Sequence, residues 1–182
     1  DVCSSDLKRI VSTREFALLV AITVVRNSPI FYFNNNGKMV GMLVRDDDQL
    51  INGVFISTIV LNVAGRLLGG KLWNYLGFFR SYALVYALNM IVDFGFVLWP
   101  RSFAVYVVLI AVQRFNNGLI IIFNQIAVFA LFKPERALYI LKYYDISFVL
   151  SVTLTTLLNS FFGNSGYRIV SAIYSVTDIA GM

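Results

Sequence analysis

Long apolar runs alternate with short polar connections along most of this chain. A helix that crosses a membrane needs roughly 20 mostly apolar residues. Because backbone polar groups cannot stay unpaired in hydrocarbon, runs of this kind are expected to be helices and not open strands. The pattern predicts six spans: Phe16–Phe33, Leu50–Gly70, Ser81–Trp99, Phe103–Phe129, Leu138–Phe162 and Tyr167–Met182.

The predicted connections between these spans are short. NNNGKMVGMLVRDDDQ, at residues 34–49, carries Asn and Asp clusters that are typical of a solvated loop. Pro29 and Arg26 interrupt the first span, and Pro29 is expected to kink its helix because it cannot donate a backbone hydrogen bond. The sixth span runs to the last residue after about 16 residues, so we expect it to be truncated.

Composition favours a membrane protein. Of the 182 residues, 58% are hydrophobic and 14% are charged, whereas ordinary globular domains carry about 25% charged residues. The expected fold class is therefore all-α, a polytopic transmembrane helical bundle. No histidine and one cysteine leave no metal cluster and no nucleophile–base pair, so we expect no enzyme, no cofactor and no metal site. The net charge of +5 is scattered between apolar runs and does not indicate nucleic-acid binding.

The first seven residues, DVCSSDL, differ from the rest of the chain. They are polar, and they are also the translation of the end of a common sequencing-library adapter. We expect residues 1–7 to be an assembly artefact, and residues 8–182 to be a six-span transmembrane bundle cut from a longer protein. The alternative is an ordinary polar N-terminus.

Basic residues predict the orientation of the spans, because cytosolic loops carry an excess of Lys and Arg. Eight basic residues fall on one predicted side and four on the other, which places residues 8–14 in the cytosol. The cytosolic group is Lys8, Arg9, Arg14, Lys71, Arg80, Lys133, Arg136 and Lys142. The opposite group is Lys38, Arg45, Arg101 and Arg168, beside Asp46, Asp47 and Asp48.

The connection between the second and third spans, GGKLWNYLGFFR, combines glycines with basic residues. Its pattern is G-x-L-x-N-x-x-G-x-x-R, formed by Gly70, Leu72, Asn74, Gly77 and Arg80. It resembles the loop signature of the major facilitator superfamily of transporters. In that family the Asn74 position is acidic and pairs with basic groups to latch one conformation. Asn74 would keep a hydrogen bond but lose the charge.

Other segments extend the resemblance over nearly the whole chain after Leu7. Arg114 and Gly118 resemble the R-x-x-x-G of the family's fourth or tenth span. Such transporters have two six-span halves, and the basic run LKRIVSTRE with the departure at Asn74 favours the C-terminal half, spans seven to twelve. Arg66, eight residues before Asn74, resembles an arginine of oxalate/formate and monocarboxylate transporters. The resemblance implies a lipid-embedded carrier that lacks its other half here.

An ionisable side chain inside a membrane span is costly unless it is paired or hydrated, so each one is a candidate for substrate binding or coupling. Arg26 lies beside Pro29 near the middle of the first span, where it would line a cavity or reach a carbonyl or the interface. Arg66 lies in the cytosolic third of the second span, with Asn62 one turn earlier on the same face. It would bind a carboxylate, or extend to the cytosolic headgroups.

Three further candidates lie in later spans. Arg114, near the middle of the fourth, is expected to line the bundle interior. Asp93 or Asp145 would pair with Arg114 or Arg66 in a gating or proton-coupling pair, although Asp145 could instead form a local pair with Lys142. The resemblance implies a lysine near the position where this chain has Asp145. Because an acidic residue lies there instead, coupling to a proton and a cationic substrate stay open as alternatives to a carboxylate substrate.

Two functions therefore remain. The first is a secondary transporter that moves a small polar solute across a membrane by alternating access. The second is a six-span structural subunit of a larger membrane complex, whose intramembrane charges are satisfied by partner chains.

Gly65 and Gly69 form a GxxxG motif, which is typical of helix packing.

Overall fold

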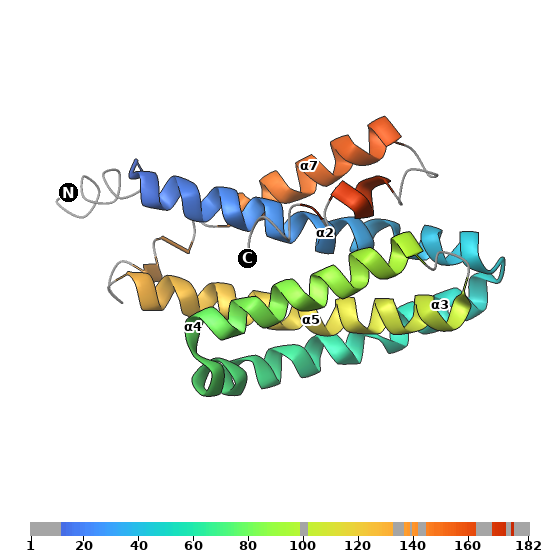
Figure 1. The fold of residues 1–182 in the computed structure, drawn as a ribbon, viewed down its shortest axis with the longest axis horizontal. Helices are drawn as coiled ribbons and strands as arrows, with labels where there is room; N and C mark the ends of the chain where they lie inside the picture. The colour runs from blue at the N-terminus through green and yellow to red at the C-terminus, as the bar shows by residue number, and fades with distance from the viewer. Residues whose placement is uncertain are drawn as a thin grey trace.

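The computed structural model describes residues 12–98, 102–132, 137–138, 140–141, 145–162, 169–173 and 176, without the side chains of residues 15, 19, 22, 25, 26, 29 and 162. Within these ranges the fold is all-α, as predicted (Figure 1). The helices are α2 (Arg14–Val44), α3 (Asp48–Ser57), α4 (Ile59–Leu98), α5 (Phe103–Leu131) and α7 (Ile146–Phe162).

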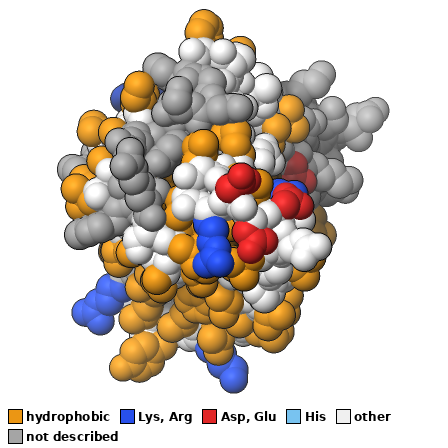
Figure 2. All heavy atoms as spheres, turned by 90° about the vertical axis from the view of Figure 1, so that its right-hand side faces the viewer, with side chains coloured by type: hydrophobic (Ala, Val, Ile, Leu, Met, Phe, Trp, Pro, Cys, Tyr) orange, Lys and Arg blue, Asp and Glu red, His pale blue; other side chains and the backbone are white. Residues whose placement is uncertain are grey.

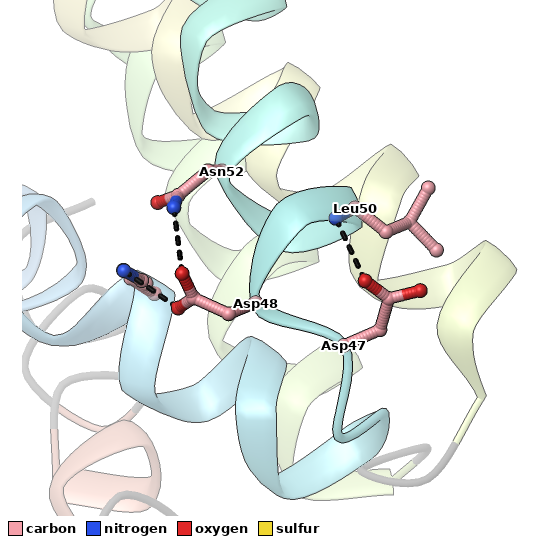
Figure 3. Close-up of polar contacts among 5 residues, drawn as sticks. Asp47, Asp48, Leu50 and Asn52 are labelled. Carbon is pink, nitrogen blue, oxygen red and sulfur yellow. Dashed lines mark hydrogen bonds and ion pairs between the residues drawn. The ribbon is translucent and has the colours of Figure 1, made fainter.

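Small polar side chains begin three of these helices. The first backbone N–H groups of a helix have no partner inside it, and a Ser, Thr or Asp at the preceding position can accept from them. Thr13 accepts from the N–H of Phe16, Asp47 from that of Leu50 (Figure 3) and Ser102 from that of Val105. Each cap marks the point where a polar connection gives way to an apolar helix.

Helix α4 is two helical limbs joined at Gly77. This glycine has φ 75° and ψ 177°, a backbone conformation outside the helical region, and the chain reverses direction there (Figure 1). Trp73 of the first limb packs against Tyr82 of the second, with ring centroids 6.0 Å apart. Residues 59–76 and 78–98 therefore form a hairpin, and α3 leads into its first limb with a single interruption at Thr58.

The predicted loop at residues 34–49 is mostly helix, so this prediction was wrong. Helix α2 continues to Val44, and only Arg45–Asp47 connect it to α3. Asn35 is exposed, whereas Asn34 is partly buried and Asn36 lies inside the bundle. Asn36 donates its amide to the carbonyl of Tyr32 one turn earlier, at 3.2 Å, and is buried. Helix α2 also runs without interruption through Pro29.

Helix α5 packs against both limbs of α4 and against α2, and α7 lies along α2 (Figure 1). Three buried apolar clusters follow the long axis. The middle one joins Ile30 of α2, Val85 of α4 and Phe123 of α5. The cluster near the α2–α3 connection includes Phe33 and Phe96, whose stacked rings are 4.5 Å apart. The third lies near the start of α2, around Phe16 and Val128.

Two stretches of the described residues are long and apolar enough to cross a membrane, Asp48–Leu98 and Phe103–Leu131. Helix α7 is apolar but shorter. The first stretch contains the reversal at Gly77. The prediction of six separate spans stays a prediction, because length and composition single out only these two stretches within the described residues.

Candidate functional site

The described bundle carries polar side chains inside and large apolar side chains outside. Asn89, Gln113 and Asn116 are at most 3% exposed, whereas Val60 and Leu67 on the first limb of α4 are 69% and 74% exposed. Buried polar groups are costly unless they are hydrogen-bonded. So many exposed large apolar side chains are unusual in a soluble domain, and apolar side chains are spread over the face shown in Figure 2. The polar groups that lie inside, beside the three apolar clusters, are therefore the candidates for a functional role.

Two amide side chains of α5 connect that helix to both of its neighbours. Gln113 donates to the carbonyl of Ile30 on α2, at 3.1 Å. Asn116 donates to the carbonyl of Val85 and to Oδ1 of Asn89, both on α4, at 3.1 and 2.6 Å. The remaining amide oxygens of Gln113 and Asn116 are buried without a hydrogen-bond partner. These two oxygens could therefore each still accept a hydrogen bond.

Asp93 lies one turn beyond Asn89 on the second limb of α4 and is only 1% exposed. No described salt bridge joins Asp93 or Asp145 to Arg114 or Arg66, so the predicted ion pairs stay predictions. Asp145 lies exposed in the turn that precedes α7, because the helix begins only at Ile146. The alternative pair of Lys142 with Asp145 lies outside the described residues.

Arg114 is half-buried at the junction of α2, α3 and α5. One of its terminal nitrogens, Nη1, donates to Oδ1 of Asn34 on α2. Its guanidinium carbon lies 4.4 Å from the centroid of the Phe55 ring on α3, which is a cation–π contact. The side chain is only partly buried, so a position lining the bundle interior stays a prediction, and its described partners are neutral.

Arg66 and Asn62 lie on one face of α4, as the spacing predicts. Nε of Arg66 donates to Oδ1 of Asn62 at 3.0 Å, and Nδ2 of Asn62 donates to the backbone carbonyl of Arg114 at 3.3 Å. Asn62 therefore links the exposed Arg66 to the backbone of α5. The arginine side chain points toward the start of α4, away from the turn at Gly77.

Gly65 and Gly118 mark the closest approach of α4 and α5. A Cβ on Gly118 would overlap the carbonyl oxygen of Asn62, and it would lie 2.9 Å from the backbone nitrogen of Arg66. A Cβ on Gly69 would lie 3.2 Å from the side chain of Ile122. The packing role predicted for Gly65 and Gly69 is confirmed, and Gly118 of the R-x-x-x-G pattern is their counterpart on α5.

The G-x-L-x-N-x-x-G-x-x-R pattern lies at the tip of the α4 hairpin, but most of it is not a loop. Gly70, Leu72 and Asn74 belong to the first helical limb, Arg80 belongs to the second, and only Gly77 departs from helical geometry. Asn74 and Arg80 are exposed, and no described hydrogen bond or ion pair involves either. The pattern therefore builds a tight reversal with one glycine.

Arg26 stands apart from the other candidates, because its backbone belongs to α2 and its side chain lies outside the described part of the chain. The neighbouring Asn27 is 1% exposed, and neither amide atom has a hydrogen-bond partner. Sequence reasoning missed Asn34 and Phe55. Asn34 follows Asn27 by seven residues, a spacing that places both on one helical face and was available as a signal.

No protein-family model, curated protein or solved structure matches the chain.

Proposed function

We propose that this chain is one six-span half, the C-terminal one, of a secondary transporter of the major facilitator type. It would move a small polar solute, with a carboxylate as the leading candidate, by alternating access between two bundles. The solute would bind at the face that carries Arg66, Asn62 and Arg114, near the middle of the membrane. The residue pattern around Gly77 and the polar interior of the bundle both support this proposal.

The observation that carries the proposal is the position of Arg66. Because α4 stays helical up to Gly77, Arg66 lies eleven residues, or about 17 Å, from the turn. Half the hydrocarbon thickness of a bilayer is about 15 Å. With the turn at the membrane surface, Arg66 lies near the midplane, deeper than the cytosolic third that the sequence suggests.

An arginine facing lipid at that depth costs about 3 kcal/mol, and it normally extends toward the nearer headgroups. Arg66 does the opposite, because its Nε is held by Asn62 one turn farther from the hairpin tip. The side chain is nevertheless exposed on the described bundle. A water-lined path between this bundle and a second one would hydrate the charge, which is the arrangement that alternating access requires.

The test uses the complete protein that contains these residues, reconstituted in liposomes. Uptake of small carboxylates, amino acids and sugars is measured with and without an imposed proton gradient. A parallel pair, Arg66→Cys and Leu67→Cys, is treated with a membrane-impermeant thiol reagent. Thiols react as thiolates, which form in water and not in apolar surroundings. Arg66→Cys is expected to react fast and to lose uptake, and the neighbouring Leu67→Cys to react slowly.

Equally slow reaction at both positions, together with no uptake of any solute, would overturn the transporter proposal. Under those results the six-span structural subunit becomes the better description, since its intramembrane charges would be covered by partner chains. Stable co-purification of such a partner from solubilised membranes would then be the expected finding.

A further inference from the structure

The guanidinium of Arg114 is oriented by groups that leave its charge intact. Asn34 accepts one N–H through a neutral amide oxygen, and Phe55 covers one face of the planar group. Nε is buried and has no hydrogen-bond partner. Arginine stays protonated in proteins, so a full positive charge is held here without a described carboxylate.

The position of this charge along α5 makes the missing anion significant. Arg114 is eleven residues from Phe103 and seventeen from Leu131, which corresponds to about 17 and 26 Å along the helix. Neither end is within easy reach of the side chain. A structural arginine at such a depth usually pairs with an acidic group, because charge in a low-dielectric interior is costly when unpaired.

The donors that Arg114 keeps without a described partner suit a carboxylate in number and spacing. A guanidinium grips a carboxylate through two neighbouring N–H groups. Nη1 donates to Asn34, and the edge formed by Nε and Nη2 has no described partner. Nε is covered in this conformation, so an anion would reach that edge only after the neighbouring side chains move. Phe55 fixes the plane of the guanidinium, so this edge has a defined direction. A guanidinium held in this way loses little side-chain entropy when an anion binds, which favours affinity.

We propose that Arg114 binds the carboxylate of a small organic anion. The anion is the solute that the proposed transporter would carry, so the transport step rests on the proposed function, whereas binding does not. Arg66 has a secondary role. Asn62 attaches it to the carbonyl of Arg114, so its charge adds to the positive potential near the site without forming the contact.

The experiment measures binding apart from transport. The complete protein is purified in detergent, and its thermal midpoint is followed in sodium acetate, lactate or oxalate against sodium chloride at equal sodium concentration. A ligand that binds only the folded state raises the midpoint with concentration. For the wild-type protein we expect at least one of the three carboxylates to do so. Arg114→Gln is expected to weaken the apparent affinity by about tenfold or more.

Asn34→Asp is the decisive variant, because it has nearly the same shape and places a carboxylate against Arg114. If Arg114 is an anion site, this variant folds with a midpoint at least equal to the wild type, but the added carboxylates no longer stabilise it. If Arg114 is structural, the new ion pair leaves the response to added anions unchanged. Arg45→Gln is the matched control, because its guanidinium also lies over a phenylalanine ring, that of Phe103 at 5.3 Å, but in the α2–α3 connection. It is expected to keep the response to the added carboxylates.

Two results would overturn the assignment: no stabilisation of the wild type by any of the three carboxylates, or a response that survives in Asn34→Asp. Should Arg114→Gln fail to fold, Asn34→Asp still decides the question. Stabilisation without uptake in liposomes would count against the transporter and leave the anion site standing. Uptake without stabilisation would count against the anion site alone.

Discussion

The α4–α5 pair and the α2–α7 pair are held together in different ways. Between α4 and α5, Gly65 and Gly118 let the two backbones touch directly. Between α2 and α7, hydroxyl groups of α7 reach carbonyls of α2. Ser151 donates to the carbonyl of Val24 and Thr155 to that of Ser28, each at 3.2 Å. The residue numbers of the donors on α7 and of the acceptors on α2 rise together, so α2 and α7 run parallel.

The two contacts tolerate change differently. A backbone contact leaves no room for an added atom, since neither helix can retreat without losing its other packing. The hydroxyls of Ser151 and Thr155 also lie 2.7 and 2.8 Å from carbonyls of their own helix, those of Ser147 and Ser151. They therefore keep a partner if α7 moves. We infer that α4 and α5 form a fixed unit and that the α2–α7 contact is the adaptable one.

The largest expected effect comes from adding one carbon at the α4–α5 crossing. In Gly118→Ala, the new Cβ overlaps the carbonyl oxygen of Asn62 and lies 3.0 Å from Cα of Gly65. Overpacking of this kind costs about 1–3 kcal/mol, and we expect about 3 because both neighbours are backbone. The measurement is the unfolding free energy of the purified protein in detergent.

The same substitution at Gly70 is the control, since no atom lies within 4 Å of the Cβ position there. Gly70→Ala is expected to stabilise the protein by about 0.4–1 kcal/mol through the unfolded state. If the two alanine variants change stability by the same amount, the α4–α5 contact is not the fixed unit described above.

A smaller loss of stability is expected from a substitution at Gly77, where the cause is the backbone conformation and not a lack of space. No atom lies within 4 Å of the Cβ position of Gly77, but its φ of 75° with ψ of 177° is a region that only glycine adopts readily. Gly77→Ala is therefore expected to cost about 2 kcal/mol with no clash. The matched variant is Gly53→Ala inside α3, which also has open space and is expected to be neutral or stabilising. Equal unfolding free energies for the two variants would mean that the reversal at Gly77 is not required.

The sequence predicts helices well here because period and length act locally. Ser102 caps α5, and the apolar run after it reaches Leu131, close to the predicted end at Phe129. The α2–α3 connection was predicted too long because Asn34 and Asn36 have the composition of a loop. Their amides are satisfied inside the bundle by Arg114 and by the carbonyl of Tyr32. Tertiary partners of this kind leave no local signal in the sequence.

The candidate site was predictable only in part. The spacing of Asn62 and Arg66 places them on one face, and their hydrogen bond confirms it. No described salt bridge joins Asp93 or Asp145 to Arg66 or Arg114, so the expected gating or coupling pair stays a prediction. Charge alone does not determine which helices meet. The ring of Phe55 over Arg114 depends on the packing of α3 against α5, which the hydrophobic pattern does not specify.

The smallest expected effect lies at the adaptable contact, in Thr155→Val. The substitution removes the hydroxyl that reaches Ser28 and keeps the shape of the side chain. Hydrogen bonds between helices in membrane proteins average about 0.6 kcal/mol, so we expect a loss near that value. Thr156→Val is the control, because that exposed hydroxyl bonds only to Val152 of its own helix and should change stability very little. Unfolding of both variants by detergent titration gives the comparison. A loss at Thr155 as large as that at Gly118 would show that α2 and α7 are fixed as rigidly as α4 and α5.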